Sequence, residues 1–359
     1  MGGRRMTGFR WLSLSALDTL MFRDGKPFSQ SDAGVSEATS IFPPWPLTVV
    51  GAVRAALWQG PLGGAWDKDR LGDGTDWADE NSLGPLAFSP PVVTKGDQPV
   101  FPAPLHILRG AAGELTLLRP GEELCCDLGK ARLPQPAKAV AGARPLEGEF
   151  VTARGMRRIL DGGLPEPGDI VAAREMFARE NRVGIAIDAG TRRVRDGYLY
   201  MATHVRPHTD IAIRVGLSGW KGALPERLIA LGSEHRQAAL AECDEIKLAV
   251  CDEIKLPGCQ PREGRRVAVA LSPVVLEKLP GPGEDLAGLG TVVSACLGKP
   301  QRISGWDTHA GRALPMRLAL PAGSVWFLEG ANGARDGAAI GLGTKWGFGA
   351  LALGRWEKS

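Results

Sequence analysis

Hydrophobic and polar residues first alternate over residues 9–16, where Leu12 and Leu14 fall on one side of an extended chain and Trp11 on the other. This two-residue period predicts a strand. Similar short runs predict further strands at residues 86–93, 105–108, 114–118, 182–187, 198–205, 210–215, 265–271, 292–296, 317–320, 324–328 and 350–356. Strands therefore dominate the expected structure.

Helical spacing of apolar residues is clearest over residues 47–59, and Pro46 suits the first turn of a helix there. Gly51 and Ala55 stand four apart in this helix, which predicts close approach of another backbone. A short basic helix is expected at residues 152–160. The strand at residues 9–16, the long loop after it and the helix at residues 47–59 together resemble the first half of a βαβ unit.

The intervening segments suggest how the chain divides. Residues 60–81 show no clear period and read as an inserted surface loop, whereas residues 133–149 form a connector rich in Pro, Ala and Gly. Because single cores stop growing well below this length, two domains are predicted, at residues 1–145 and 146–359. A helical turn is expected at residues 225–230 in the second.

Composition fits a folded protein with many turns. The 359 residues are 44% hydrophobic and 23% charged, and they include 48 Gly and 27 Pro. A net charge of +3 is no general signal of a nucleic-acid partner. However, 31 of the 43 cations are Arg, the residue best suited to planar contact with phosphate or carboxylate.

The six cysteines lack the C-x2-C spacing of zinc or redox sites, so neither a metal nor a cofactor is expected. With no secretory signal and no run of eighteen apolar residues, we expect a cytoplasmic protein with reduced thiols and no transmembrane helix. The hexapeptide that begins at Cys243 recurs unchanged from Cys251. We interpret it as a local duplication in a tolerant loop.

A Gly-rich tail contains Gly343, Lys345, Trp346, Gly347 and Gly349. Closely approaching backbone amides, a cation and an aromatic ring could together hold phosphate and base. No helix follows the loop, as a P-loop or Rossmann fingerprint would require. Taken alone, the tail favours a Gly-rich turn.

Two cation positions stand out near the N-terminus. Arg23 and Lys26 flank Asp24-Gly25. This segment is either a loop that contacts phosphate or a solvated turn with a local ion pair. Arg54 lies in an otherwise apolar or small helix, where a buried cation needs a partner. It is either paired inside the protein or directed at an anionic ligand.

No persuasive catalytic site is found. Glu234, His235 and Arg236 form a triplet that could supply a general base with His204 nearby, yet none of the five histidines fits a nucleophile or metal pattern. The ten tryptophans are mostly expected in the core or at interfaces. Those in Gly/Pro-rich surroundings could instead stack on bases, namely Trp45, Trp306 and Trp346.

Seven segments in a fixed order resemble one family over nearly the whole chain. They are FRDGKPF (22–28), FPPWP (42–46) leading to GAVRA (51–55), ENRVGI (180–185) followed by GYLY (197–200), GSEHR (232–236), ISGWD (303–307), PAGS (321–324) and the Gly-rich tail. Together these are similar to the subunit of type III-B CRISPR (Cmr) effector complexes that holds the 5′ end of the guide RNA, a member of the RAMP superfamily.

The resemblance implies an α+β fold of two tandem ferredoxin-like βαββαβ domains with long loops and a Gly-rich loop before the last strand. It implies a non-catalytic subunit that caps the repeat-derived 5′ tag of the guide RNA (crRNA). Its implied neighbours are the large polymerase/cyclase-like subunit and the first backbone RAMP subunit, in a hetero-oligomeric antiviral ribonucleoprotein.

Residues are assigned on this basis in two groups. Those expected to bind RNA are Arg23, Lys26, Arg54, Arg182, His235, Arg236, Gly343, Lys345 and Trp346. Those expected to shape the motifs are Asp24, Gly25, Pro43, Pro44, Gly51, Gly305, Trp306, Asp307, Gly347 and Gly349. No RRM-type aromatic stretch is present, so loops rather than sheet aromatics are expected to contact RNA.

Two alternatives stay open. One is a metal-independent endoribonuclease that matures guide RNA, with His235 or His204 as the base. The other is a purely structural assembly protein that makes no RNA contact.

Overall fold

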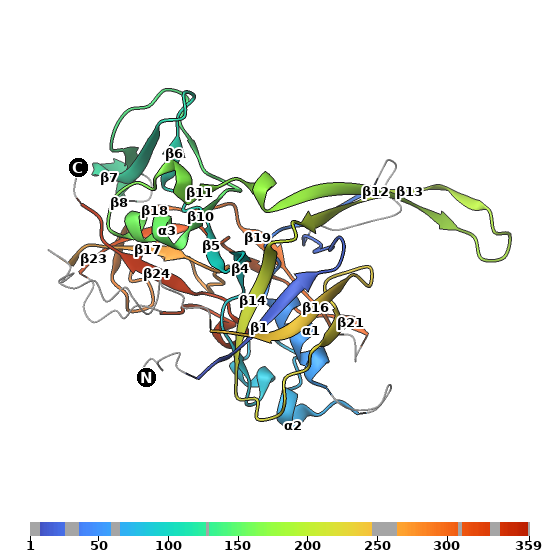
Figure 1. Cartoon of the computed structure of the whole chain (residues 1–359). Helices are drawn as coiled ribbons and strands as arrows, with labels where there is room; N and C mark the ends of the chain where they lie inside the picture. The colour runs from blue at the N-terminus through green and yellow to red at the C-terminus, as the bar shows by residue number, and fades with distance from the viewer. Residues whose placement is uncertain are drawn as a thin grey trace.

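The computed structural model describes residues 8–25, 36–58, 65–126, 129–245, 264–307, 311–330 and 338–357. Strands supply most of its regular structure and helices are few, which makes the fold α+β (Figure 1). Within these ranges, no helix is both long enough and apolar enough to cross a bilayer.

The larger sheet runs in the order β11-β10-β5-β4-β14-β1-β16-β15, with β3 paired to β14. Its strands are β1 (Arg10–Ala16), β3 (Ala87–Phe88), β4 (Val92–Lys95), β5 (Gln98–Pro102), β10 (Phe150–Thr152), β11 (Ile170–Val171), β14 (Ile211–Ser218), β15 (Arg227–Ala230) and β16 (Gln237–Cys243). Residues 225–230 were expected to be helical. That prediction is wrong, because β15 pairs antiparallel with β16.

A second sheet is ordered β18-β23-β17-β24 and comprises β17 (Arg266–Ala270), β18 (Thr291–Cys296), β23 (Val325–Glu329) and β24 (Leu351–Gly354). All neighbouring strands in this sheet are antiparallel, as they are in the set β16-β1-β14-β4 of the first sheet. When the strands of each set are numbered along the chain, both sets have the spatial order 4-1-3-2. This is the strand order of a ferredoxin-like unit.

Two complete βαββαβ domains are nevertheless not what the structure shows. Helix α1 (Pro46–Leu57) joins β1 to β4, whereas β15 and loops join β14 to β16. No helix of α type joins β17 to β18, nor β23 to β24 within the described part of that connection. The strand order of both sheets thus agrees with the predicted ferredoxin-like domains, whereas several of the connecting helices that such domains require are replaced by strands or loops.

The predicted boundary at residue 145 does not separate the two sheets. Strands β10 and β14 pair with β5 and β1, which lie before the boundary. One apolar core also joins the two sheets, because it holds Trp11 and Phe101 together with Val267 and Phe327. Helix α3 (Ala153–Leu160) contributes Met156 to it, and was predicted at nearly these residues.

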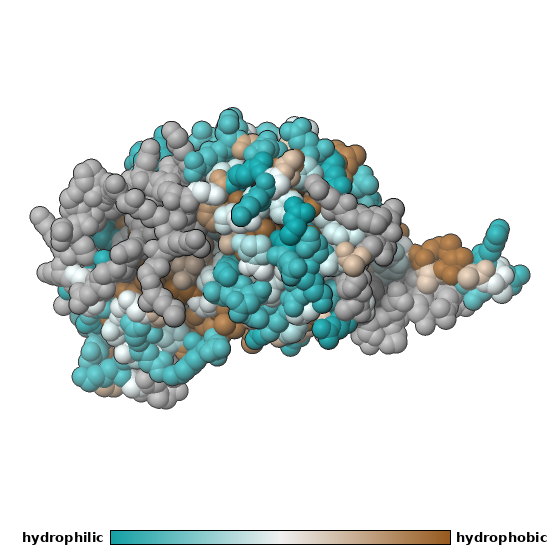
Figure 2. Space-filling model, turned by 90° about the horizontal axis from the view of Figure 1, so that it is seen from below, coloured by the Kyte–Doolittle hydropathy of each residue, from teal (hydrophilic) through white to brown (hydrophobic). Residues whose placement is uncertain are grey.

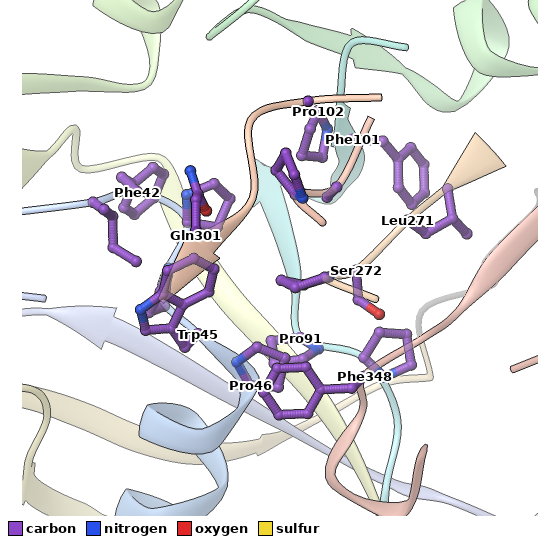
Figure 3. Close-up of a pocket in the computed structure, with 18 of the residues that line it drawn as sticks. Phe42, Trp45, Pro46, Pro91, Phe101, Pro102, Leu271, Ser272, Gln301 and Phe348 are labelled. Atoms are coloured by element: carbon purple, nitrogen blue, oxygen red, sulfur yellow. The ribbon is translucent and has the colours of Figure 1, made fainter. Parts of the chain in front are cut away.

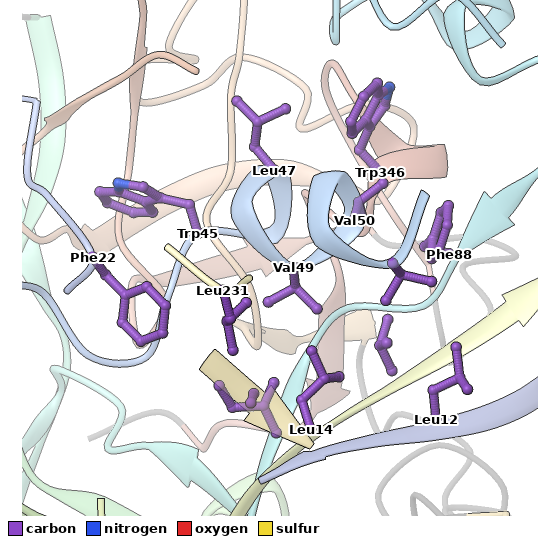
Figure 4. Close-up of a cluster of buried hydrophobic side chains, with 14 of the residues drawn as sticks. Leu12, Leu14, Phe22, Trp45, Leu47, Val49, Val50, Phe88, Leu231 and Trp346 are labelled. Carbon is purple, nitrogen blue, oxygen red and sulfur yellow. The ribbon is translucent and has the colours of Figure 1, made fainter. Parts of the chain in front are cut away.

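A second core lies under α1 (Figure 4). Leu12 and Leu14 of β1 face it, whereas Trp11 faces the core between the sheets, as the alternation predicted. Helix α1 buries both Val49 and Val50 in this core. The expected close backbone approach at Gly51 is wrong, because a Cβ added there would have no atom within 4 Å.

A long hairpin projects from the body (Figure 1). It consists of β12 (Phe177–Ile187) and β13 (Val194–Pro207), and β2 (Ser36–Thr39) pairs in parallel with β13. The sequence predicted a hairpin here, and the strands extend beyond the predicted ranges. A four-stranded sheet, β8-β7-β6-β9, contains β6 (Ile107–Arg109), β7 (Leu115–Cys126), β8 (Gly129–Pro136) and β9 (Arg144–Pro145), so part of the expected connector is strand.

The segment read as a surface loop at residues 60–81 is partly buried where it is described. It holds α2 (Lys68–Leu71) and leads into the short 3-10 helix η1 (Glu80–Leu83). Trp77 is fully buried and stacks on Phe348 of the tail at 4.8 Å between ring centroids. The expectation of a simple surface loop is therefore wrong.

Candidate nucleic-acid interface

A cavity of about 920 Å³ lies where loops of the two sheets meet (Figure 3). Its wall is aromatic and proline-rich, with Phe42, Trp45, Phe101 and Phe348 among its rings. Pro43 and Pro44, expected to shape the second motif, line it as well. Prolines and packed rings have few conformations to lose, so the cavity is preformed.

The loop containing Arg23 reaches this cavity. The Phe22 amide donates to Ser40 Oγ at 3.0 Å, and the Asp24 amide donates to the Thr39 carbonyl at 3.1 Å. A Cβ on Gly25 would lie 2.0 Å from the Arg302 carbonyl oxygen, so only glycine fits there. Backbone contacts at Asp24 and Gly25 therefore constrain the path of this loop, and Arg23 is exposed. Lys26 lies outside the described residues.

Three cations at the cavity were missed by sequence reasoning. Lys299 and Arg302 are exposed, and no described residue forms an ion pair with either. Arg179 lines the cavity and donates from Nη1 to the Ser40 carbonyl at 3.1 Å. These residues come from chain segments far apart in sequence, so no local motif could have marked them. They line the cavity together with the carboxylates of Asp24, Glu147 and Glu149, and Glu149 is paired with Arg109.

The Gly-rich tail is a rigid turn rather than an open phosphate cradle. Gly343, Gly347 and Gly349 all have positive φ, and a Cβ on Gly349 would lie 1.9 Å from the Ile340 carbonyl oxygen. The amides of residues 346–349 already donate to backbone carbonyls. Lys345, on the short 3-10 helix η5 (Thr344–Trp346), is half-buried, and no described residue pairs with it.

The expectation that Trp346 stacks on a base is wrong. Its side chain is 1% exposed, and Nε1 donates to Ser82 Oγ at 3.3 Å. Trp45 is also in the core, although its ring borders the cavity (Figure 3). Of the three tryptophans considered for stacking, only Trp306 is exposed, at 65%.

Arg54 is paired inside the protein and does not reach an exterior ligand. It is 7% exposed, and it donates from Nε to the Leu71 carbonyl and from Nη2 to the Gly72 carbonyl, both at 2.9 Å. Its guanidinium lies 5.3 Å from the ring centroids of both Trp66 and Trp346. Burial lowers the Arg54 pKa to about 10, so the group stays charged at neutral pH. The prediction of an RNA contact fails because the side chain is enclosed.

Arg182 and Arg236 lie at the base of the hairpin in a charge network. Asp18 accepts from Arg206 Nη1 at 2.6 Å and from Arg182 Nη2 at 3.4 Å, and lies 3.8 Å from Arg236 Nη1. Glu180 accepts from Arg182 and Arg206, each at 2.7 Å. Hydrogen bonds from Arg206 hold the pKa of the Asp18 carboxyl below its ordinary value. The network ties the hairpin to the turn after β1.

The turn that carries His235 is fixed by its neighbours. Glu234 and His235 both have positive φ, and the Glu234 carboxylate lies 3.0 Å from His204 Nε2. The His204 ring is fully buried, its Nδ1 lies 3.1 Å from Thr19 Oγ1, and burial lowers its pKa. His235 itself is exposed.

Gly305, Trp306 and Asp307 belong to a ribbon over α1. A Cβ on Gly305 would lie 2.7 Å from Leu47 Cδ2, which explains the glycine. Asp307 is close enough to Arg54 to oppose the fall of its pKa. Among the described residues, no three His, Cys, Asp or Glu side chains are grouped to hold a metal.

Comparison with known proteins identifies the family. The sequence profile of CRISPR-associated protein (Cas_Cmr3) matches residues 12–356. The chain is similar in fold to one in the cryo-EM structure of the type III-B Cmr-beta bound to cognate target RNA and AMPPnP, with a TM-score of 0.51 and 18% identity, over 89% of this chain and 86% of that chain.

Two further solved structures resemble it. Cmr-beta bound to cognate target RNA gives a TM-score of 0.51 at 19% identity, with the same coverage of 89% and 86%. A chain of the Csm3–Csm4 subcomplex of the type III-A CRISPR-Cas interference complex gives 0.43 at 9% identity, over 97% and 100%. No curated protein sequence matches. The chain belongs to the Cas_Cmr3 family of CRISPR-associated proteins.

Proposed function

We propose that this subunit is a non-catalytic RNA-binding protein that holds the 5′ repeat-derived tag of the crRNA in its effector complex. The observation that carries the proposal is that three cations, Arg179, Lys299 and Arg302, line the aromatic cavity, and that no described residue forms an ion pair with Lys299 or Arg302. The family membership supports it, because it places the chain among CRISPR-associated proteins.

The cavity has the chemistry that a short single-stranded RNA end requires. Splayed bases are recognised by stacking and edge hydrogen bonds, while Arg and Lys contact phosphates. The ring of Phe42 at the wall would receive a base, and Lys299 and Arg302 would hold the adjacent phosphates. Lys345 is retained as a further candidate because its neighbour Thr344 lines the cavity.

The hairpin would make the linking contacts. It projects from the body, with apolar side chains on its surface (Figure 2). Val183, Ile185, Ile187 and Val194 are between 47% and 68% exposed, and exposed apolar patches of this kind mark interaction sites. We propose that the hairpin contacts the backbone RAMP subunit, and that the body meets the large polymerase/cyclase-like subunit.

Charge reversal at the cavity tests the RNA proposal. The double variant Lys299→Glu/Arg302→Glu, assembled with its partner subunits, is expected to lose at least tenfold in affinity for tag-bearing RNA, and the loss should shrink as salt rises. Lys138→Glu/Lys221→Glu changes the same net charge at exposed lysines away from the cavity and is the matched control. Equal RNA retention by both double variants would refute the proposal.

A nuclease assay separates the catalytic alternative. His204 is buried with both ring nitrogens engaged, so of the two candidate bases only His235 is accessible. The purified chain is expected to leave repeat RNA intact. Specific cleavage that disappears in His235→Ala would establish the endoribonuclease instead.

A further inference from the structure

The sheet that contains the hairpin is continuous with the wall of the cavity. Strand β2 pairs with β13 as far as Thr39, and the chain then runs directly into Ser40 and Phe42, which both line the cavity. The Ser40 amide donates to the Thr203 carbonyl of β13 at 3.1 Å, so the contact with the hairpin extends beyond the end of β2. The hairpin and the cavity are therefore joined through the backbone.

The first strand of the hairpin also reaches the cavity, through two side chains. Phe177, the first residue of β12, is buried, and its ring centroid lies 4.9 Å from that of Phe42 in the cavity wall. Arg179, two residues further along, is exposed and itself lines the cavity. The ring proposed to receive a base thus rests on a residue of the hairpin.

Arg179 differs in its partners from the other arginines at the base of the hairpin. Arg182 and Arg206 donate to carboxylates. Arg179 instead donates from Nη1 to the neutral Ser40 carbonyl at 3.1 Å and lies 5.9 Å from the Phe177 ring centroid, and no described carboxylate pairs with it. Because a guanidinium has five N–H donors, Arg179 keeps donors for an anionic ligand.

A phosphate in the cavity would be a stronger partner for Arg179 than the carbonyl that it contacts in this chain. Arginine forms charge-assisted, frequently bidentate hydrogen bonds with phosphate, which a single bond to a neutral carbonyl does not match. The rest of the guanidinium can keep the bond to Ser40 at the same time. Because Arg179 belongs to β12, the phosphate that it holds would fasten the hairpin to the cavity at an additional point.

The distal part of the hairpin depends on this base for its direction. Strand β12 runs from Phe177 at the base to Ile187, and the hairpin projects from the body (Figure 1). A restraint at the base of a projecting ribbon therefore reduces the motion of the whole ribbon. Asp18 already ties the base to the turn after β1 through Arg206, so the cavity side is where ligand binding can add a restraint.

We propose that Arg179 couples RNA binding in the cavity to the hairpin, so that RNA in the cavity restrains the hairpin and prepares it for its subunit contact. Because coupling between two sites is reciprocal, a subunit that engages the hairpin raises the RNA affinity of the cavity by the same factor. This inference rests on the proposed function, because it requires RNA in the cavity, and it adds a regulatory link between the RNA and protein contacts.

Hydrogen exchange of the full chain tests the coupling, measured with and without a crRNA fragment that carries the 5′ tag. The fragment is supplied at concentrations that saturate each variant, as checked by fluorescence anisotropy. In the wild type, the bound fragment is expected to slow amide exchange in β12 and β13 by about tenfold, the effect of one added hydrogen bond between charged groups. In Arg179→Met, this slowing is expected to disappear even when the RNA is bound.

The matched control is Arg193→Met, which removes the same charge from the exposed connection between β12 and β13, outside the cavity lining. It is expected to retain the slowing of the wild type. Equal slowing in Arg179→Met and Arg193→Met, or no slowing in the wild type with RNA bound, would overturn the inference and leave the proposed function standing. A tag fragment that does not bind the wild-type chain would contradict both.

Discussion

Replacing Arg54 with methionine distinguishes an internal clamp from an RNA ligand. Methionine keeps much of the length of the side chain but removes the charge and the hydrogen bonds. In Arg54→Met, the carbonyl of Gly72 still accepts from Trp66 Nε1 at 2.7 Å. The Leu71 carbonyl loses its arginine donor, so one buried acceptor is left without it.

The expected loss of stability follows from the contacts of Arg54. Two hydrogen bonds from a charged donor contribute roughly 3–6 kcal/mol, and two cation–π contacts contribute roughly 1–4 kcal/mol. Burial opposes them, because the lowering of the Arg54 pKa from 12.5 to about 10 corresponds to roughly 3 kcal/mol. The net loss is about 4 kcal/mol, within a range of roughly 1–7 kcal/mol, and for a cooperative chain of this length about 4 kcal/mol lowers the Tm by about 5 °C.

Thermal unfolding and RNA retention are measured on the same preparations. Arg54→Met should unfold at lower temperature than the wild type, while the folded protein in the assembled complex keeps its RNA affinity. Arg54→Lys retains the charge but cannot reproduce both hydrogen bonds, so its Tm should lie between the two. An unchanged Tm with a tenfold loss of RNA affinity would refute the clamp and restore Arg54 as a ligand.

Three further experiments test other parts of the structure. Burial lowers the His106 pKa to about 3, so on acidification the unfolded chain takes up the proton before the folded chain does. The free energy of unfolding should therefore fall as the pH drops from 6.5 towards 3, by up to about 1.4 kcal/mol per pH unit. His106→Phe should flatten this pH dependence in urea titrations at pH 4.5, 5.5 and 7, and an unaltered dependence would show that His106 is not its source. Gly349→Ala should destabilise the chain, because the added Cβ would lie 1.9 Å from the Ile340 carbonyl oxygen. Gly51→Ala, in a helix where the added Cβ meets no atom within 4 Å, should instead stabilise the chain by about 0.5–1 kcal/mol. Equal Tm shifts for the two variants would contradict the geometry of the tail. Asp18→Asn should speed amide hydrogen exchange in β12 and β13 because it weakens the bonds from Arg206, and exchange as slow as in the wild type would show that the network does not hold the hairpin.

Local patterns in the sequence were sufficient for α1 and for strands such as β1, β14, β17 and β23, whereas β5, β10 and β16 were not predicted. The alternation at residues 9–16 placed Leu12 and Trp11 on the correct sides because each side of β1 meets a different core. Residues 225–230 were misassigned because pairing with β16 overrides a weak local preference. The larger sheet takes strands from both sides of residue 145, and no local signal in the sequence reports such long-range pairing.

The candidate site was predictable only where a motif is local. The loop of Asp24 and Gly25 was marked by its own composition, and its glycine proved to be required by a backbone contact. Arg302 and Lys299 could not be found this way, since they become neighbours of that loop only in the folded chain. Trp346 was misjudged because a tryptophan in a Gly-rich turn has the same local sequence whether it is buried or exposed.

The most direct test of the central claim is crosslinking of the crRNA tag within the assembled complex. Guide RNA carrying 4-thiouridine in its 5′ tag is irradiated, and the crosslinked peptides are identified by mass spectrometry. The account predicts crosslinks to this chain at peptides that contain Arg23, Phe42 or the segment from Lys299 to Arg302. Tag crosslinks confined to partner subunits would contradict it.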